Sequence, residues 1–255
     1  MTGLPLLIRK EMLEQVRTMR LWVVMIVFAL FAIVSPLTAK YLPDIVRALA
    51  GDQLNLASVL PTPSTPDAVD QFLKNLTQFG ALAAILLAMG SVATEKDRGT
   101  AAFVLTKPAS RAAFLVAKLV AISANLLLAT AAAGVLGWYY TTVLFEPLPI
   151  GGYATMCLLL WLSLVVYASL TFLGSTLTSS AAAGAGIGVL FLVVTGIVAA
   201  LPTVGGYTPE ALAVPARQAA LGLAAPDLAG ALAANVALAV LAMLLSWLVF
   251  RRQEL

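Results

Sequence analysis

Histidine is absent from the chain, and cysteine occurs once, at Cys157. The missing histidine removes the usual general base, the usual zinc ligand and the side chain that titrates near neutral pH. A single cysteine cannot form an internal disulfide, and its position inside an apolar run is typical of a small packing residue. These absences exclude much of enzymology, and the sequence predicts no catalytic residue and no metal ligand.

Charged residues are also scarce. They make up 11% of the chain, hydrophobic residues make up 61%, and the mean hydropathy is +0.99. A soluble domain carries about 25% charged residues, so this composition predicts an all-α integral membrane protein. The net charge of +3 is spread over segments beside apolar runs, which favours a role in membrane orientation and not a nucleic-acid partner.

Uncharged runs mark the membrane spans, because a helix needs about 20 apolar residues to cross a hydrocarbon core of ~30 Å. The uncharged run over residues 147–209 is long enough for two spans. Residues 1–255 therefore read as one transmembrane domain, with outer loops at 40–74 and 202–227. Six spans are predicted, near residues 21–39, 75–94, 112–145, 152–176, 181–201 and 228–250.

The distribution of Lys and Arg predicts the orientation. With six spans both termini lie on one side of the membrane, and that side holds eleven of the 15 basic residues. The other side holds the remaining four, Lys40, Arg47, Lys74 and Arg217. Because basic residues concentrate in cytoplasmic loops, both termini are predicted to be cytoplasmic.

Two helices outside the spans are expected. Residues 4–20 place Ile8, Met12, Val16 and Met19 at helical spacing, which predicts an amphipathic helix in the cytoplasmic membrane interface. A solvated helical tail is the alternative. In the outer loops, Thr65 is expected to cap a helix that runs into the second span, and residues 211–223 form a helical stretch too short to cross.

The segment 95–111, between the second and third spans, carries the most specific signal. Gly99 permits a sharp turn, and Thr100 can cap a short helix that presents Phe103 and Leu105 to water. An exposed apolar helix between charged flanks is typical of a docking surface, and a loop whose charges only fix the topology is the alternative. The residues of this candidate docking segment are Glu95, Lys96, Asp97, Arg98, Gly99, Thr100, Phe103, Leu105 and Pro108.

This segment resembles the permeases of the type-2 ABC exporter family. In that family an acidic–basic cluster is followed by Gly-Thr, a short helix, Pro, Ser and Arg. The matching residues here are Glu95-Lys96-Asp97-Arg98-Gly99-Thr100, Pro108, Ser110-Arg111 and Lys118. The six spans and the amphipathic first helix fit the same family.

The resemblance implies a permease subunit of an exporter in the plasma membrane of a prokaryote. Two permeases, alike or different, would work with two cytoplasmic ATPase subunits that bind ATP and magnesium. The helix near Thr100–Leu105 would be the coupling helix, seated in a groove of an ATPase. The chain itself has no Gly-x4-Gly-Lys-Ser/Thr phosphate loop, so it is expected to bind no cofactor. Membrane lipid is the further partner expected.

Small and polar residues within the spans are expected to serve packing. Ser180, Gly184 and Gly188 recur every four residues, a spacing that lets helices approach closely in lipid. They could pack one subunit, form a dimer seam or act as a gate, and the sequence leaves these open. Asn125 and Asn235 are expected to form hydrogen bonds between helices.

The spans show no evident ionisable group at mid-membrane depth, which disfavours an ion-coupled carrier. An energy-independent or ion-coupled carrier, and an ABC-like protein that transmits a signal without transport, remain the alternatives to an exporter. The substrate is not predicted, although the apolar spans favour hydrophobic or amphiphilic cargo.

Overall fold

A computed structural model describes residues 3–50, 62–99, 110–224 and 228–253. Within these ranges all the regular structure is helical, and six helical segments are long and apolar enough to cross a membrane. The predicted all-α fold with six spans is confirmed. The elements are α1 (Leu4–Arg17), α2 (Arg20–Ala50), α3 (Thr65–Ala88), α4 (Ala93–Asp97), α6 (Arg111–Leu144), α7 (Ile150–Leu177), α8 (Ala181–Ala199), η2 (Gly205–Tyr207), η3 (Glu210–Leu212), α9 (Ala213–Ala220) and α10 (Leu228–Arg251).

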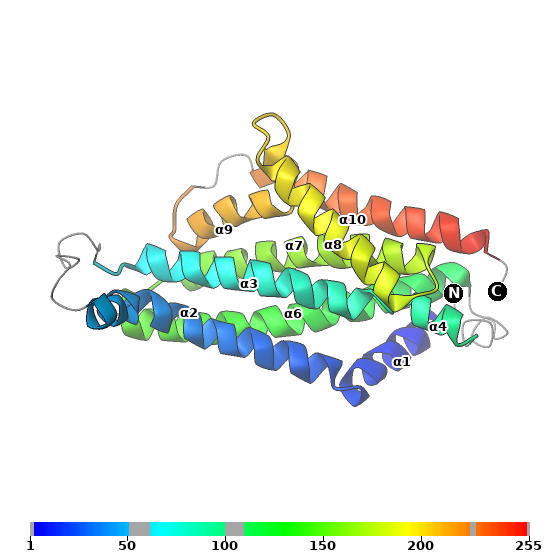
Figure 1. Cartoon of the computed structure of the whole chain (residues 1–255), viewed down its shortest axis with the longest axis horizontal. Coiled ribbons are helices and arrows are strands. Elements are labelled where there is room, and N and C mark those ends of the chain that lie inside the picture. Colours follow the sequence, from blue (N-terminus) through cyan, green and yellow to red (C-terminus); the bar gives the residue numbers. More distant parts are fainter. Residues whose placement is uncertain (1–2, 51–61, 100–109, 225–227, 254–255) are drawn as a thin grey trace.

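Helix α7 forms the centre of the bundle. It packs against α3, α6, α8, α9 and α10, and 78% of its apolar stretch is buried. Figure 1 shows α3, α6 and α7 in the middle, with α8 and α10 along one side and α2 along the other. The largest fully buried side chains come mainly from these middle helices and include Phe72, Phe114, Leu164, Tyr167 and Phe172.

The outer helices α8 and α10 present apolar side chains outward. Only 11% of the apolar stretch of α8 and 17% of that of α10 are buried. Val193 and Ile197 on α8, and Val240 and Leu244 on α10, are all exposed. Hydrocarbon, unlike water, tolerates such a surface, which agrees with helices that face lipid.

Several helix ends differ from the sequence expectation. Helix α1 ends at Arg17, whereas the expected helix continued to residue 20. Helix α2 continues to Ala50, so helix extends into the segment expected to be an outer loop. Helix α3 is capped by Ser64 and not by Thr65, because Ser64 and Asp67 form a reciprocal capping box. Helix α3 also ends at Ala88, and a turn separates it from α4, so the expected second span is divided near its charged end.

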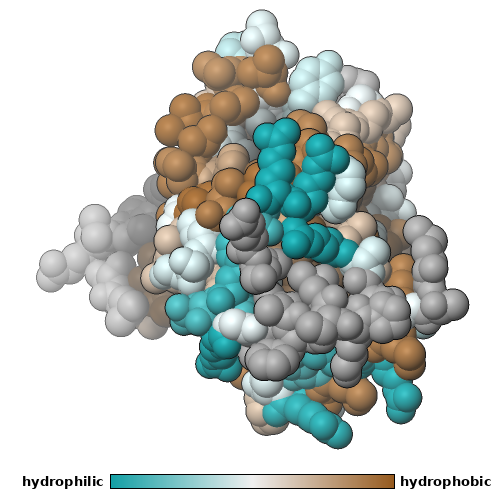
Figure 2. All heavy atoms as spheres, turned by 90° about the vertical axis from the view of Figure 1, so that its right-hand side faces the viewer, coloured by the Kyte–Doolittle hydropathy of each residue, from teal (hydrophilic) through white to brown (hydrophobic). Residues whose placement is uncertain are grey.

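Helix α1 begins and helix α10 ends at the same end of the bundle (Figure 1). We call this the charged end; it comprises α1, α4, the first turns of α6 and the last turn of α10. The elements at the opposite end of the spans, η2, η3, α9 and the first turns of α3, are together called the far end. Figure 2 looks onto the charged end and shows hydrophilic side chains gathered there, bordered by hydrophobic ones.

Candidate functional site

A buried lysine joins three helices at the charged end. Lys118 on α6 is 3% exposed, and its Nζ lies 3.0 Å from Glu11 Oε2 on α1 and 2.6 Å from Glu95 Oε1 on α4. A buried ammonium group is costly unless charged partners surround it, and here two carboxylates do so. Lys118 therefore fixes the position of both α1 and α4 against the bundle.

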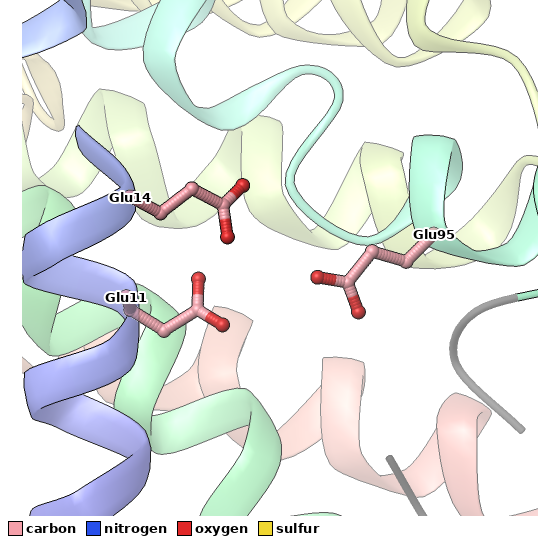
Figure 3. A group of neighbouring side chains, drawn as sticks. All are labelled: Glu11, Glu14 and Glu95. Carbon is pink, nitrogen blue, oxygen red and sulfur yellow. The ribbon is translucent and has the colours of Figure 1, made fainter. Parts of the chain in front are cut away.

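A second lysine completes this charged network at its rim. Figure 3 shows the carboxylates of Glu11 and Glu14 on α1 and Glu95 on α4 pointing toward one another. Lys10 Nζ lies 2.9 Å from Glu11, 3.4 Å from Glu14 and 3.5 Å from Glu95. Burial alone would lower the pKa of Lys10, but its hydrogen bond to Glu11 and the charges of Glu11, Glu95 and Glu14 outweigh burial and raise that pKa. Lys10 therefore stays protonated.

The three carboxylates lie close enough to share a cation. Their nearest oxygens all lie within 4.8 Å of one another. The ammonium groups of Lys10 and Lys118 already contact these carboxylates, so the cluster is an ion-pair network. The network borders a cavity of about 430 Å³ between α1, the α3–α4 turn and α6, which gives water a path to the charges.

Helix α1 turns its polar side chains toward the bundle. Glu11 and Gln15 are buried, and Asn125 Nδ2 on α6 donates a hydrogen bond to Gln15 Oε1. Val16 on α1 and Met19 in the turn after it are exposed, whereas Ile8 and Met12 are half-buried. An outward apolar face agrees with the expected interfacial helix, but the polar contacts to α6 were not expected from the sequence.

The segment before residue 100 is held to the bundle by α4. Ser175 Oγ on α7 accepts hydrogen bonds from the backbone N–H groups of Val92 and Ala93, at 3.1 and 3.0 Å. Lys96 Nζ donates to the carbonyl oxygen of Thr176 at 2.7 Å and contacts Gln253 Oε1 at 3.4 Å. The two bonds to Ser175 satisfy backbone N–H groups at the start of α4, a helix only five residues long.

The chain leaves α4 through Gly99, which has a φ of +67°. Glycine adopts this left-handed conformation without the penalty that a Cβ would bring. Asp97 and Arg98, just before it, are exposed. The sharp turn expected at Gly99 is therefore present.

The segment after residue 109 is anchored by Arg111. Ser110 caps α6 by accepting from the N–H of Ala113. Arg111 Nη1 donates to the carbonyl oxygens of Phe250, Arg251 and Gln253, each at 3.0–3.1 Å. The last carbonyls of a helix have no partner within the helix, so a guanidinium group stabilises them both by hydrogen bonds and by its charge.

The predicted docking residues thus fall into two groups. Glu95, Lys96, Asp97, Arg98 and Gly99 lie on or directly after α4, where Glu95 and Lys96 face the bundle. Thr100, Phe103, Leu105 and Pro108 lie outside the residues that the structure describes. What is described is the frame on both sides of them, formed by α4 and by the start of α6.

The predicted packing residues lie at the start of α8. A Cβ on Gly184 would lie 2.5 Å from the carbonyl oxygen of Met89, and one on Gly188 would lie 2.5 Å from Thr171 Oγ1. Both glycines thus let α8 approach other helices of the same chain. Ser180 is exposed and caps α8, so it serves the helix end and not the contact.

Two polar contacts lie at the far end. Asp70 on α3 and Arg217 on α9 form an exposed ion pair at 2.5 Å. Glu210 on η3 reaches back to the bundle, where its Oε1 accepts from the hydroxyl groups of Tyr167 and Thr195. The sequence placed Glu210 in an outer loop and gave no signal of this contact.

Comparison with known proteins matches this architecture. Residues 6–255 match the family model described as "ABC-2 family transporter protein". The chain is also 30% identical, over 190 residues, to the uncharacterized transmembrane protein YxlG of Bacillus subtilis (strain 168). That alignment covers 72% of this chain and 71% of the other.

Proposed function

The chain belongs to the ABC-2 transporter family, and on that basis we propose that it is the permease subunit of an ATP-driven exporter. Membership of this family makes it a membrane transport component. We further propose that the direction of transport is export. We also propose that residues 95–111 couple the chain to separate ATPase subunits.

The observation that supports coupling is the double anchoring of segment 95–111. On one side α4 is bonded to α7 through Ser175 and to α6 through Lys118. On the other side Arg111 joins the start of α6 to the end of α10. A displacement of the segment would therefore be transmitted to α6, α7 and α10, because both of its ends are bonded to these helices.

Helix α1 extends the same frame. Glu11 and Gln15 bond to α6 through Lys118 and Asn125, so α1 moves with the bundle. In the proposed assembly the charged end is cytoplasmic and faces two ATPase subunits, which bind ATP and magnesium. A second permease subunit completes the translocation path in the plasma membrane of a prokaryote.

A pull-down from native membranes tests this proposal. The tagged chain should co-purify in mild detergent with a protein that carries a phosphate loop, and Phe103→Asp should abolish the capture. Tyr207→Asp is the matched control, because Tyr207 is an exposed aromatic residue at the far end. Capture of no ATPase would favour a carrier or a structural protein. Equal loss in both variants would contradict docking through Phe103.

Gly99 offers a second test of coupling. Proline cannot adopt the φ of +67° observed at Gly99, and it would also remove the N–H that bonds to the carbonyl of Lys96. Gly99→Pro should leave membrane insertion intact and separate ATP hydrolysis from transport. Gly99→Ala is a milder change, because its Cβ meets no atom within 4 Å, it keeps the N–H, and it carries only the strain of the left-handed φ. Transport at the parental rate in Gly99→Pro would refute the coupling role.

A further inference from the structure

A groove of about 560 Å³ opens between α3, α8 and α9 in the half of the bundle nearer the far end. Helices α3 and α8 are in close contact at their charged ends, where Gly184 lies against Met89. Farther along, Leu82 on α3 and Leu192 on α8 line the groove together. The ion pair of Asp70 with Arg217 joins α3 to α9 at the far end.

The walls of the groove are mainly apolar. Leu73, Leu82, Leu192 and Val214 contribute to them, and Leu82 and Val214 are exposed. An apolar chain lying here would contact apolar side chains on both sides. The groove therefore suits the apolar part of an amphiphilic molecule.

The groove lining also contains polar and charged side chains, namely Asp70, Lys74, Thr77, Gln78, Tyr167, Glu210 and Arg217. Arg217 is paired with Asp70, and Glu210 is the second carboxylate. Glu210 Oε1 accepts hydrogen bonds from the hydroxyl groups of Tyr167 and Thr195. Its Oε2 is buried and has no hydrogen-bond partner among the described residues. A buried carboxylate oxygen without a partner is costly, so a missing partner is implied.

We infer that this groove binds the exported substrate, an amphiphile with a protonated amine and an apolar chain. The ammonium group would pair with Glu210, and the chain would lie between Leu82 and Leu192. Because Oε2 has almost no exposed surface, the carboxylate must turn toward the groove when the cation enters. The assignment of the ligand as cargo rests on the proposed exporter function; the binding site itself does not.

The experiment uses the purified chain in phosphatidylcholine nanodiscs, without any ATPase. The probe is dodecylamine with a diazirine in its chain, and mass spectrometry locates the labelled peptides. Labelling should fall on α3 and α8, and unmodified dodecylamine should compete for it, whereas dodecanol and dodecanoic acid should not. Equal competition by dodecylamine, dodecanol and dodecanoic acid would overturn the inference, because the headgroup would then not contribute to binding.

Two variants and one control sharpen the result. Glu210→Gln keeps an acceptor for Tyr167 but removes the charge, and it should weaken amine binding about tenfold or more. Glu146→Gln, a glutamate outside the groove, should leave binding unchanged. Leu82→Trp fills the groove from an exposed position and should also abolish labelling, so it decides the matter if Glu210→Gln fails to fold. Unchanged labelling in Leu82→Trp would contradict the proposal.

A final arm separates cargo from lipid. In nanodiscs of phosphatidylethanolamine, which carries its own ammonium group, labelling by the probe should persist. Its loss would assign the groove to membrane lipid and overturn the role in export. A chain that captures an ATPase but binds no amine would remove this inference and leave the proposed function standing.

Discussion

The ion pairs at the two ends of the bundle differ in burial and in the number of segments they join. At the charged end, Lys118 is 3% exposed and bonds to carboxylates on two other helices. At the far end, Arg217 and Asp70 are 39% and 47% exposed and join two helices. Solvent screens the second pair more strongly than the first. The comparison indicates that the positions of α1 and α4 relative to α6, next to segment 95–111, are fixed more firmly than the contact between α3 and α9.

Removal of the buried cation should produce the largest effect. Lys118→Met keeps the side-chain volume but removes the buried cation that Glu11 and Glu95 share, and leaves them only Lys10 at the half-exposed rim. Breaking a buried ion pair from one side costs about 3–5 kcal/mol, and we expect a loss of that size in the free energy of unfolding. Thermal unfolding in detergent measures it. Lys10→Met, at the half-exposed rim, should cost about 1 kcal/mol or less; equal costs would contradict the comparison.

Loss of the close contact at the start of α8 should produce the next largest decrease in the free energy of unfolding. A Cβ at position 184 would clash with the backbone of Met89, which cannot move aside as a flexible side chain could. Gly184→Ala should therefore lower the free energy of unfolding by up to about 3 kcal/mol. Gly186→Ala, where a Cβ meets no atom within 4 Å, is the matched control and should be neutral or stabilising. The same denaturation assay compares them, and a neutral Gly184→Ala would refute the close packing.

The hydrogen bonds to α4 should contribute less. Ser175→Ala leaves the N–H groups of Val92 and Ala93 without their acceptor, at a cost of about 1–2 kcal/mol. Hydrogen exchange should rise at residues 92–97 in this variant. Ser169→Ala removes only a bond from a hydroxyl group to a carbonyl of its own helix, so it should leave exchange in α4 unchanged. Unaltered protection of α4 in Ser175→Ala would show that this anchor is dispensable.

The exposed pair at the far end should contribute least. Arg217→Gln should change the free energy of unfolding by less than about 1 kcal/mol, and 1 M salt should remove the difference. Denaturation at low and high salt checks this. A cost as large as that of Lys118→Met, or one that persists at high salt, would erase the distinction between the two ends.

The sequence predicted the six spans because long uncharged runs can be counted without knowledge of tertiary structure. It placed the end of the first span at Lys40, however, and helix α2 continues beyond it. Lys40 Nζ donates to the carbonyl oxygen of Leu144 at the end of α6, so its charge is satisfied inside the bundle. A charged residue therefore need not end a helix when another part of the bundle supplies a hydrogen-bond partner for its charge.

The frame around segment 95–111 was predicted only in part. Local patterns indicated the turn at Gly99 and the cap at Ser110, because both depend on neighbouring residues alone. The bonds of Lys118 to Glu11 and of Arg111 to the end of α10 join residues more than a hundred positions apart, and no local pattern indicates such pairs. One signal was present: Glu11 and Gln15 share a face of α1, as Lys118 and Asn125 share a face of α6, and each polar residue pairs with its counterpart.

Site-specific photocrosslinking in intact cells tests the central claim most directly. A benzoyl-phenylalanine placed at Arg98, beside the docking segment, is compared with one at Tyr207 on the far end; both native residues are exposed. The proposed function predicts that position 98 alone forms an adduct with a protein that carries a phosphate loop. An adduct from position 207, or none from position 98, would contradict the assignment of the charged end as the ATPase-binding surface.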